Sequence, residues 1–188
     1  MTAFVENMNE LRAHHKSLLA GGKQQAARSF SMPSATALDD VSPDEAIALE
    51  ELKSTAKMLA ITQNQGMELS ITKDAQDLSN AAGNAAATAA FKQQMNERRL
   101  YEKEQSEKNI DRIFDKAIEI GERHPNAQKA IMSTTEIIFN LFRLMSEKFN
   151  IFITKVIAET ITWVKNAFAD IKSTFSNIGG WIQGWFAS

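Results

Sequence analysis

Apolar residues recur along this chain at steps of three and four, which is the period of an amphipathic helix. The clearest run lies within residues 129–188 and continues almost to the terminus. Because all its members fall on one side of a helix, the run predicts a buried face, whose partner can be another helix, a second copy of the chain or a bilayer. We call this run the C-terminal stripe: Ile153, Ile157, Ile161, Val164, Phe168, Ile171, Phe175, Ile178 and Ile182.

A second seam precedes the stripe and repeats in heptad steps. Pro125 can occupy the first position of the helix that carries both. We therefore predict one aromatic amphipathic helix with a tail over residues 125–188. The seam consists of Ile138, Phe142, Met145, Phe149, Phe152 and Val156.

The middle of the chain begins with a clear helix start. Ser42-Pro43-Asp44-Glu45 places a capping Ser before a Pro at the first helical position, and the Glu completes a capping box. We predict a long helical arm over residues 42–124, with a possible break near 64–66 or 83 left open. Lys92 to Lys108 is nearly all polar and predicts a solvated face. A seam of mainly small residues runs through Ile71, Ala75, Leu78, Ala82, Ala85 and Ala89.

Residues 1–22 predict a short amphipathic helix that stops at Gly21-Gly22. Residues 23–41 are rich in Ser, Ala, Gln and Thr, lack a helical period and predict a flexible linker. Gly121 and His124-Pro125 end the arm, where the chain is expected to reverse. The predicted fold is therefore all-α: an elongated antiparallel helical hairpin or bundle, dominated by two long amphipathic helices.

Composition and charge narrow the function. The net charge of −2 argues against nucleic acid as a partner, because phosphate-binding domains usually carry a basic surplus. Residues 129–188 are mildly cationic, however, which favours an anionic membrane surface. Charged residues interrupt every apolar run that approaches the roughly 18 residues of a spanning helix. No cleavable signal peptide is visible at the start, and the chain has no cysteine.

The sequence predicts no enzyme, no cofactor and no metal site. His14 and His15 are adjacent, so on a helix they point about 100° apart and cannot chelate one ion together. His124 precedes Pro125 and is expected at a helix terminus. No cluster of polar residues with catalytic spacing is present.

The aromatic end carries the functional hypothesis. Tryptophan suits membrane interfaces because its ring is apolar and its N–H needs a polar partner. Trp163 has the alternative of being a core residue, and the terminal segment that of folding back as a cap. The predicted membrane or partner contacts are Trp163, Phe168, Phe175, Trp181, Ile182, Trp185 and Phe186. The predicted self-association seams are Ile71, Leu78, Ala82 and Ala85 with Ile138, Phe142, Met145, Phe149 and Phe152.

This layout resembles the small helical translocator and tip-filament proteins of bacterial type III secretion systems. The run from Trp163 to Phe186 is also similar to stretches of phage tape-measure and ejection proteins. The resemblance implies a bacterial protein that is secreted without a Sec signal or is virion-associated, forms a homo-oligomer or binds a helical partner, and touches a membrane. The alternative is a cytoplasmic adaptor or chaperone-like module whose aromatic stripe is intramolecular core.

Overall fold

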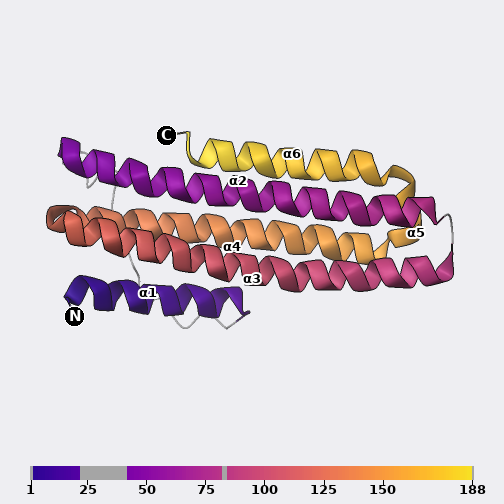
Figure 1. The fold of residues 1–188 in the computed structure, drawn as a ribbon, viewed down its shortest axis with the longest axis horizontal. Coiled ribbons are helices and arrows are strands. Elements are labelled where there is room, and N and C mark those ends of the chain that lie inside the picture. Colours follow the sequence, from indigo (N-terminus) through magenta and orange to yellow (C-terminus); the bar gives the residue numbers. More distant parts are fainter. Residues whose placement is uncertain (1, 22–41, 82–83, 188) are drawn as a thin grey trace. The chain divides into compact units, whose positions relative to one another are not determined.

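The structure, a computed structural model, describes residues 2–21, 42–81 and 84–187, and this part of the chain is helical without a β-strand. The predicted all-α class is confirmed. The predicted linker at 23–41 and Gly83 lie outside the described residues. The elements, labelled in Figure 1, are α1 (Ala3–Leu19), α2 (Pro43–Asn80), α3 (Ala85–Arg123), η2 (Pro125–Ala127), α4 (Gln128–Ala158), α5 (Thr160–Trp163), η3 (Val164–Asn166) and α6 (Ala167–Trp185).

The chain divides into two compact units, and α2, α3 and α4 each contribute residues to both. The first unit comprises Met1–Met58 and Ser106–Arg143, and the second comprises Leu59–Gln105 and Leu144–Ser188. Each unit has its own buried apolar core. Each is therefore described by itself.

In the first unit, α1 is amphipathic and buries Phe4, Met8, Leu11 and His15. Its N-terminus is capped by the Thr2 hydroxyl, which accepts a hydrogen bond from the backbone N–H of Val5 at 3.4 Å. Its C-terminal end is followed by Gly21, whose φ of 79° lies in the left-handed region that favours glycine. The predicted stop at Gly21 is confirmed.

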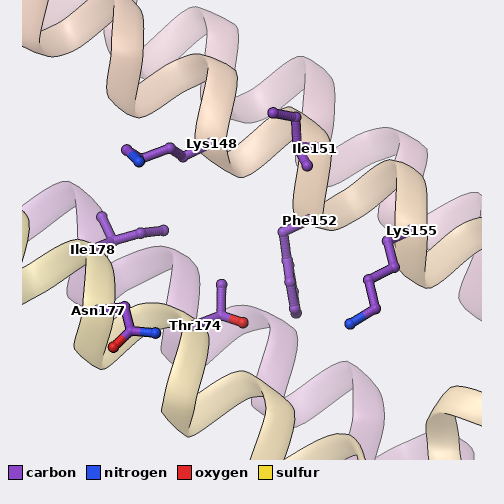
Figure 2. A pocket seen from close by; sticks show the side chains of 7 residues that line it. All are labelled: Lys148, Ile151, Phe152, Lys155, Thr174, Asn177 and Ile178. Atoms are coloured by element: carbon purple, nitrogen blue, oxygen red, sulfur yellow. The ribbon is translucent and has the colours of Figure 1, made fainter.

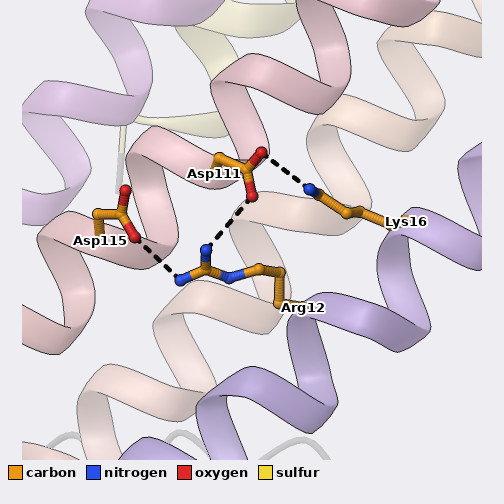
Figure 3. Close-up of polar contacts among 4 residues, drawn as sticks. All are labelled: Arg12, Lys16, Asp111 and Asp115. Carbon is orange, nitrogen blue, oxygen red and sulfur yellow. Dashed lines mark hydrogen bonds and ion pairs between the residues drawn. The ribbon is translucent and has the colours of Figure 1, made fainter.

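Ion pairs join α1 to α3 (Figure 3). The guanidinium of Arg12 lies 3.4 Å from Asp111 and 3.0 Å from Asp115, and Lys16 lies 2.8 Å from the other carboxylate oxygen of Asp111. These groups are partly exposed, so each pair contributes little stability alone. The apolar side chains beneath them therefore supply most of the docking energy of α1.

The remaining helices of the first unit confirm two predictions. The capping box forms at the start of α2, where Ser42 N–H donates to the Glu45 carboxylate at 3.0 Å and Glu45 N–H donates to the Ser42 hydroxyl at 3.3 Å. The chain also reverses at Pro125, so that Phe114 of α3 stacks on Phe139 of α4 with ring centroids 4.2 Å apart.

In the second unit, α2 runs unbroken through Asn64, Gln65 and Gly66. Its pairing with α3 includes a largely buried ion pair, in which Arg98 donates to both carboxylate oxygens of Asp74 at 2.9 and 3.2 Å. The break near residue 83 that the sequence left open interrupts the seam from Ile71 to Ala89, because α2 ends at Asn80 and α3 begins at Ala85. A helix end interrupts the register, and both Ala85 and Ala89 are exposed.

The predicted solvated face of Lys92 to Lys108 also needs correction. Glu102 is 2% exposed and its carboxylate accepts a hydrogen bond from the hydroxyl of Ser146 on α4 at 3.0 Å. Arg99 of α3 donates to the Thr154 hydroxyl of α4 at 2.8 Å. Polar side chains in this segment therefore pair with α4 instead of only facing solvent.

The largest difference from the predicted fold lies after Ala158. The prediction of a single helix over 125–188 is wrong: α4 ends, α5 and η3 form an irregular turn, and α6 runs back in the direction opposite to α4 (Figure 1). At this turn the Thr160 hydroxyl donates to the backbone carbonyls of Val156 and Ile157, at 2.7 and 3.2 Å. Folding back buries an apolar face that one straight helix would leave without a partner in the chain.

The reversal also divides the C-terminal stripe. Ile153, Ile171, Phe175, Ile178 and Ile182 are buried in the second unit. Ile161, within the turn, is 72% exposed, and Phe168, at the start of α6, is 42% exposed. The expectation that all nine residues share one helix face is therefore wrong.

Candidate functional site: the α4–α6 groove

The second half of α4 and α6 form an antiparallel pair held by aromatic rings. Phe175 of α6 stacks on Phe149 with centroids 5.9 Å apart and meets the edge of Phe152 at 5.5 Å. Trp163 lies at the turn, 6% exposed, and stacks on Phe91 of α3 at 5.7 Å. This core fixes α6 against α4 and positions the groove that opens between them.

The groove has a volume of about 390 Å³. Figure 2 shows Lys148 and Lys155 of α4 on either side of Phe152, with α6 facing them across the opening. Phe152 and Ile178 are each 5% exposed and form an apolar floor, and Ile151 is 67% exposed at the wall. The side chains that line it are Lys148, Ile151, Phe152, Lys155, Thr174, Asn177 and Ile178.

The two lysines differ in their partners. Lys155 pairs with Asp170 at 3.4 Å, and the same carboxylate accepts a hydrogen bond from the indole N–H of Trp163 at 2.7 Å. Lys148 lies over the ring of Trp181, with its Nζ 5.0 Å from the centroid. Among the described residues, Lys148 has no carboxylate within ion-pair distance. Its positive charge is therefore not neutralised within the unit.

An aromatic edge extends from the Lys148 side of the groove. Trp181 and Trp185 lie one turn apart on α6, with ring centroids 5.4 Å apart, and both are half-buried. Phe186, which caps the C-terminal end of α6, is also half-buried. We call Trp181, Trp185 and Phe186 the aromatic edge. No acidic residue follows Asp170 in the sequence.

This combination of groups supports binding more readily than catalysis. The groove offers an apolar floor, two ammonium groups, a hydroxyl and an amide, but no pair of groups placed to transfer a proton or attack a substrate. In the described ranges, no group of three or more His, Asp or Glu side chains is placed to hold a metal ion. A ligand that combines an anionic group with an apolar part would complement the groove.

The predicted contact residues fall into two groups. Trp163, Phe175 and Ile182 are core residues in this structure, with 6%, 1% and 0% of their surfaces exposed. The others keep access to solvent at the turn or at the aromatic edge: Phe168, Trp181, Trp185 and Phe186.

Most residues of the predicted self-association seams are buried within the single chain. Ala85 is exposed, and Ala82 lies outside the described residues. The buried members are Ile71, Leu78, Ile138, Phe142, Met145, Phe149 and Phe152.

The rings of the adjacent His14 and His15 meet edge to face, with their centroids 5.4 Å apart. The structure adds that His15 is 5% exposed and packs on Phe139 at 4.8 Å. Its Nε2 is buried without a hydrogen-bond partner. Burial, with smaller contributions from the nearby His14 and Arg143, lowers the pKa of His15 to about 4.

Sequence reasoning missed the groove, although a signal for it was present. Lys148 and Lys155 are seven residues apart, which places them on the same side of a helix, and Phe152 lies between them. The helical period alone could not show that α6 returns to that side of α4.

A second hollow of about 430 Å³ lies in the same unit, near the turn. It has one lysine and no aromatic ring among its lining residues, which makes it less suited to an amphiphilic ligand than the α4–α6 groove. These residues are Leu78, Ser79, Thr88, Thr160, Ile161, Val164 and Lys165.

Comparison of the chain with protein-family models, with curated proteins and with solved structures finds no match. Among the described helices, none is both long enough and apolar enough to cross a membrane.

Proposed function

We propose that this chain is a non-enzymatic helical protein that docks on an anionic membrane surface through the aromatic edge and the adjoining lysines. The observation that carries the proposal is the position of Lys148 directly over Trp181, beside the half-buried Trp185. An aromatic group at the solvent boundary next to an unneutralised cation matches the chemistry of a lipid headgroup layer.

The composition of α6 supports this mode of contact. Its exposed positions include Lys172, small polar residues and glycines, and none of them is acidic. Anionic lipid would therefore meet little repulsion along this face. Because Phe175, Ile178 and Ile182 are already buried, the proposed contact uses the edge of a folded helix pair and needs no release of the core.

Co-sedimentation with vesicles tests the proposal. The chain should bind vesicles that contain phosphatidylglycerol, bind phosphatidylcholine vesicles more weakly, and lose affinity as salt rises. Replacing both Trp181 and Trp185 by Ala should weaken binding by roughly tenfold or more, since each ring removed loses buried apolar area. Tyr101→Ala is the matched control, because Tyr101 is 51% exposed on α3, outside the groove and the aromatic edge.

A second candidate function is a soluble adaptor or chaperone-like module. The burial of Trp163, Phe175 and Ile182 favours it, because most of the aromatic surface is already used within the chain. Under this alternative the chain would ignore anionic vesicles. Loss of both tryptophans would then lower the free energy of unfolding without changing any lipid response.

Secretion or virion association, and self-association, remain part of the proposal. The predicted seams are buried within the chain, so an oligomer would have to use other surfaces. The exposed apolar side chains Leu69 and Leu100 of the second unit, 72% and 68% exposed, offer such surface. The mass of the purified chain across a concentration series measures this directly.

A further inference from the structure

We infer that the α4–α6 groove holds one anionic phospholipid, with its phosphate at Lys148 and the first part of an acyl chain over Phe152 and Ile178. This inference rests on the proposed membrane docking. It goes further by assigning a site for a single lipid molecule beside the general interfacial contact of the aromatic edge.

The apolar floor of the groove indicates that the ligand has an apolar part. Phe152 and Ile178 come from the two facing helices and are almost fully buried, while Ile151 remains 67% exposed beside them. An aliphatic chain lying along this floor would cover the exposed apolar surface of Ile151 and the little of Phe152 and Ile178 that water reaches. A compact inorganic anion would leave that surface uncovered.

The charged side chains of the groove indicate that the polar part of the ligand is anionic. Lys155 already faces Asp170 at 3.4 Å, whereas Lys148 has a ring as its described partner. An incoming phosphate would therefore meet its least neutralised cation at Lys148. The Thr174 hydroxyl and the Asn177 amide, on the facing helix, offer further donors to headgroup oxygens. Among the described residues, no acidic side chain lines the groove to oppose an anion.

The size of the groove limits how much of the lipid it can hold. A volume of about 390 Å³ lies near the lower end of the range for small-molecule pockets, roughly 300–1,000 Å³. It therefore accommodates a headgroup phosphate and a short stretch of one chain. The rest of the lipid would stay in the bilayer, beside the aromatic edge.

The test uses a lipid that is soluble as single molecules. Dihexanoyl phosphatidylglycerol, kept below its micelle concentration, is titrated into the full chain and followed by amide chemical shifts. We expect saturable shifts confined to the groove, at residues near Lys148, Phe152, Thr174 and Ile178. Dihexanoyl phosphatidylcholine has the same acyl chains and no net charge. Its affinity should be lower by a factor of about ten or more.

Matched lysine variants separate the groove from general attraction. Lys148→Gln should weaken binding of the soluble lipid about tenfold. Lys172→Gln removes the same charge from an exposed position of α6 that does not line the groove, and should leave this affinity unchanged. Thr174→Trp, which places a ring in the opening, should also abolish binding while the amide spectrum of the core stays unchanged.

The outcomes distinguish the inference from the proposed function. Vesicle binding without saturable binding of the soluble lipid would overturn the inference and leave membrane docking in place. Equal effects of Lys148→Gln and Lys172→Gln on the soluble lipid would also overturn it, because the charge alone would then explain binding. Failure to bind anionic vesicles would overturn the proposed docking, whatever the soluble lipid does.

Discussion

The side-chain amide of Asn64 donates a hydrogen bond to the backbone carbonyl oxygen of Phe175, 3.1 Å away. This bond joins α2 to α6 in the core of the second unit, where Asn64 is 5% exposed. Its other side-chain atom, Oδ1, is buried without a partner. Asn64, in the segment where the sequence left a helix break open, is thus one of the polar attachment points of the C-terminal helix.

Asn64→Asp tests that attachment. The change keeps the shape but removes the donor, and places a buried carboxylate against a carbonyl oxygen. We expect it to lower the free energy of unfolding by roughly 1–3 kcal/mol at neutral pH, measured by urea denaturation. Gln65→Glu introduces the same charge at the exposed neighbouring position and should cost less than about 0.5 kcal/mol. Equal costs for the two variants would show that the hydrogen bond does not hold α6.

Because His15 is buried in α1, we predict that low pH destabilises the packing of α1. Burial, with the positive charges of His14 and Arg143, lowers the pKa of His15 to about 4, whereas an unfolded histidine titrates near 6.5. The folded state therefore binds fewer protons, so this stability is complete above about pH 6.5 and is lost as pH falls toward 4. The difference amounts to about 2 kcal/mol by pH 5, measurable by hydrogen exchange of the α1 amides.

Two histidine variants isolate this effect. His15→Leu keeps an apolar side chain on Phe139 and should flatten the dependence between pH 7 and 5. His124→Gln removes a histidine that lies before η2 and should leave the dependence unchanged. The carboxylates that pair with α1, Asp111 and Asp115, lie on α3. If the pH dependence of α1 stability persists in His15→Leu, it arises from those carboxylates and not from His15.

Gly121 of α3 lies against the ring of Phe4 of α1. A methyl group added at this position would overlap the ring of Phe4. We therefore expect Gly121→Ala to destabilise the first unit by roughly 1–3 kcal/mol, because a buried ring must move. Gly66→Ala makes the same change in open space inside α2 and should instead stabilise by up to about 1 kcal/mol. Thermal unfolding of both variants shows whether each change raises or lowers the stability. A stabilised Gly121→Ala would contradict the docking of α1.

Asp74 and Asp77 illustrate how burial separates residues that look alike in sequence. The side chain of Asp74 is 4% exposed and accepts two hydrogen bonds from Arg98, whereas Asp77 is exposed. Asp74→Asn should therefore cost roughly 2–3 kcal/mol, because it leaves the guanidinium without its counter-charge. Asp77→Asn is the control and should cost less than about 0.5 kcal/mol. Similar costs would mean that the buried pair contributes nothing beyond an exposed charge.

Local features of the fold were predictable from the sequence. Two of these features are the capping box of Ser42 and Glu45 and the helix stop at Gly21. Each depends only on residues three or four positions apart, so the local sequence is enough to predict it. The reversal near Pro125 was predictable for the same reason. The period of Phe142, Phe149 and Phe152 likewise identified a buried face.

The site depended on pairings that the period does not encode. A stripe with steps of three and four shows which side of a helix is apolar, but not whether its partner comes from the same chain. One long helix and a folded-back helix pair have the same spacing of apolar residues. What distinguishes them is the turn, where the side chains of Thr160 and Trp163 form hydrogen bonds. The contact between Lys148 and Trp181 exists only after that reversal.

Tryptophan quenching on vesicles tests membrane docking most directly. In a Trp163→Phe variant, which keeps a ring against Phe91, the two remaining tryptophans are Trp181 and Trp185. With phosphatidylglycerol vesicles that carry bromine at shallow acyl positions, we predict a blue shift and strong quenching, weaker with deep bromine and lost in phosphatidylcholine. Emission that is unchanged by either vesicle, from a chain that remains folded, would contradict the account and favour the soluble adaptor.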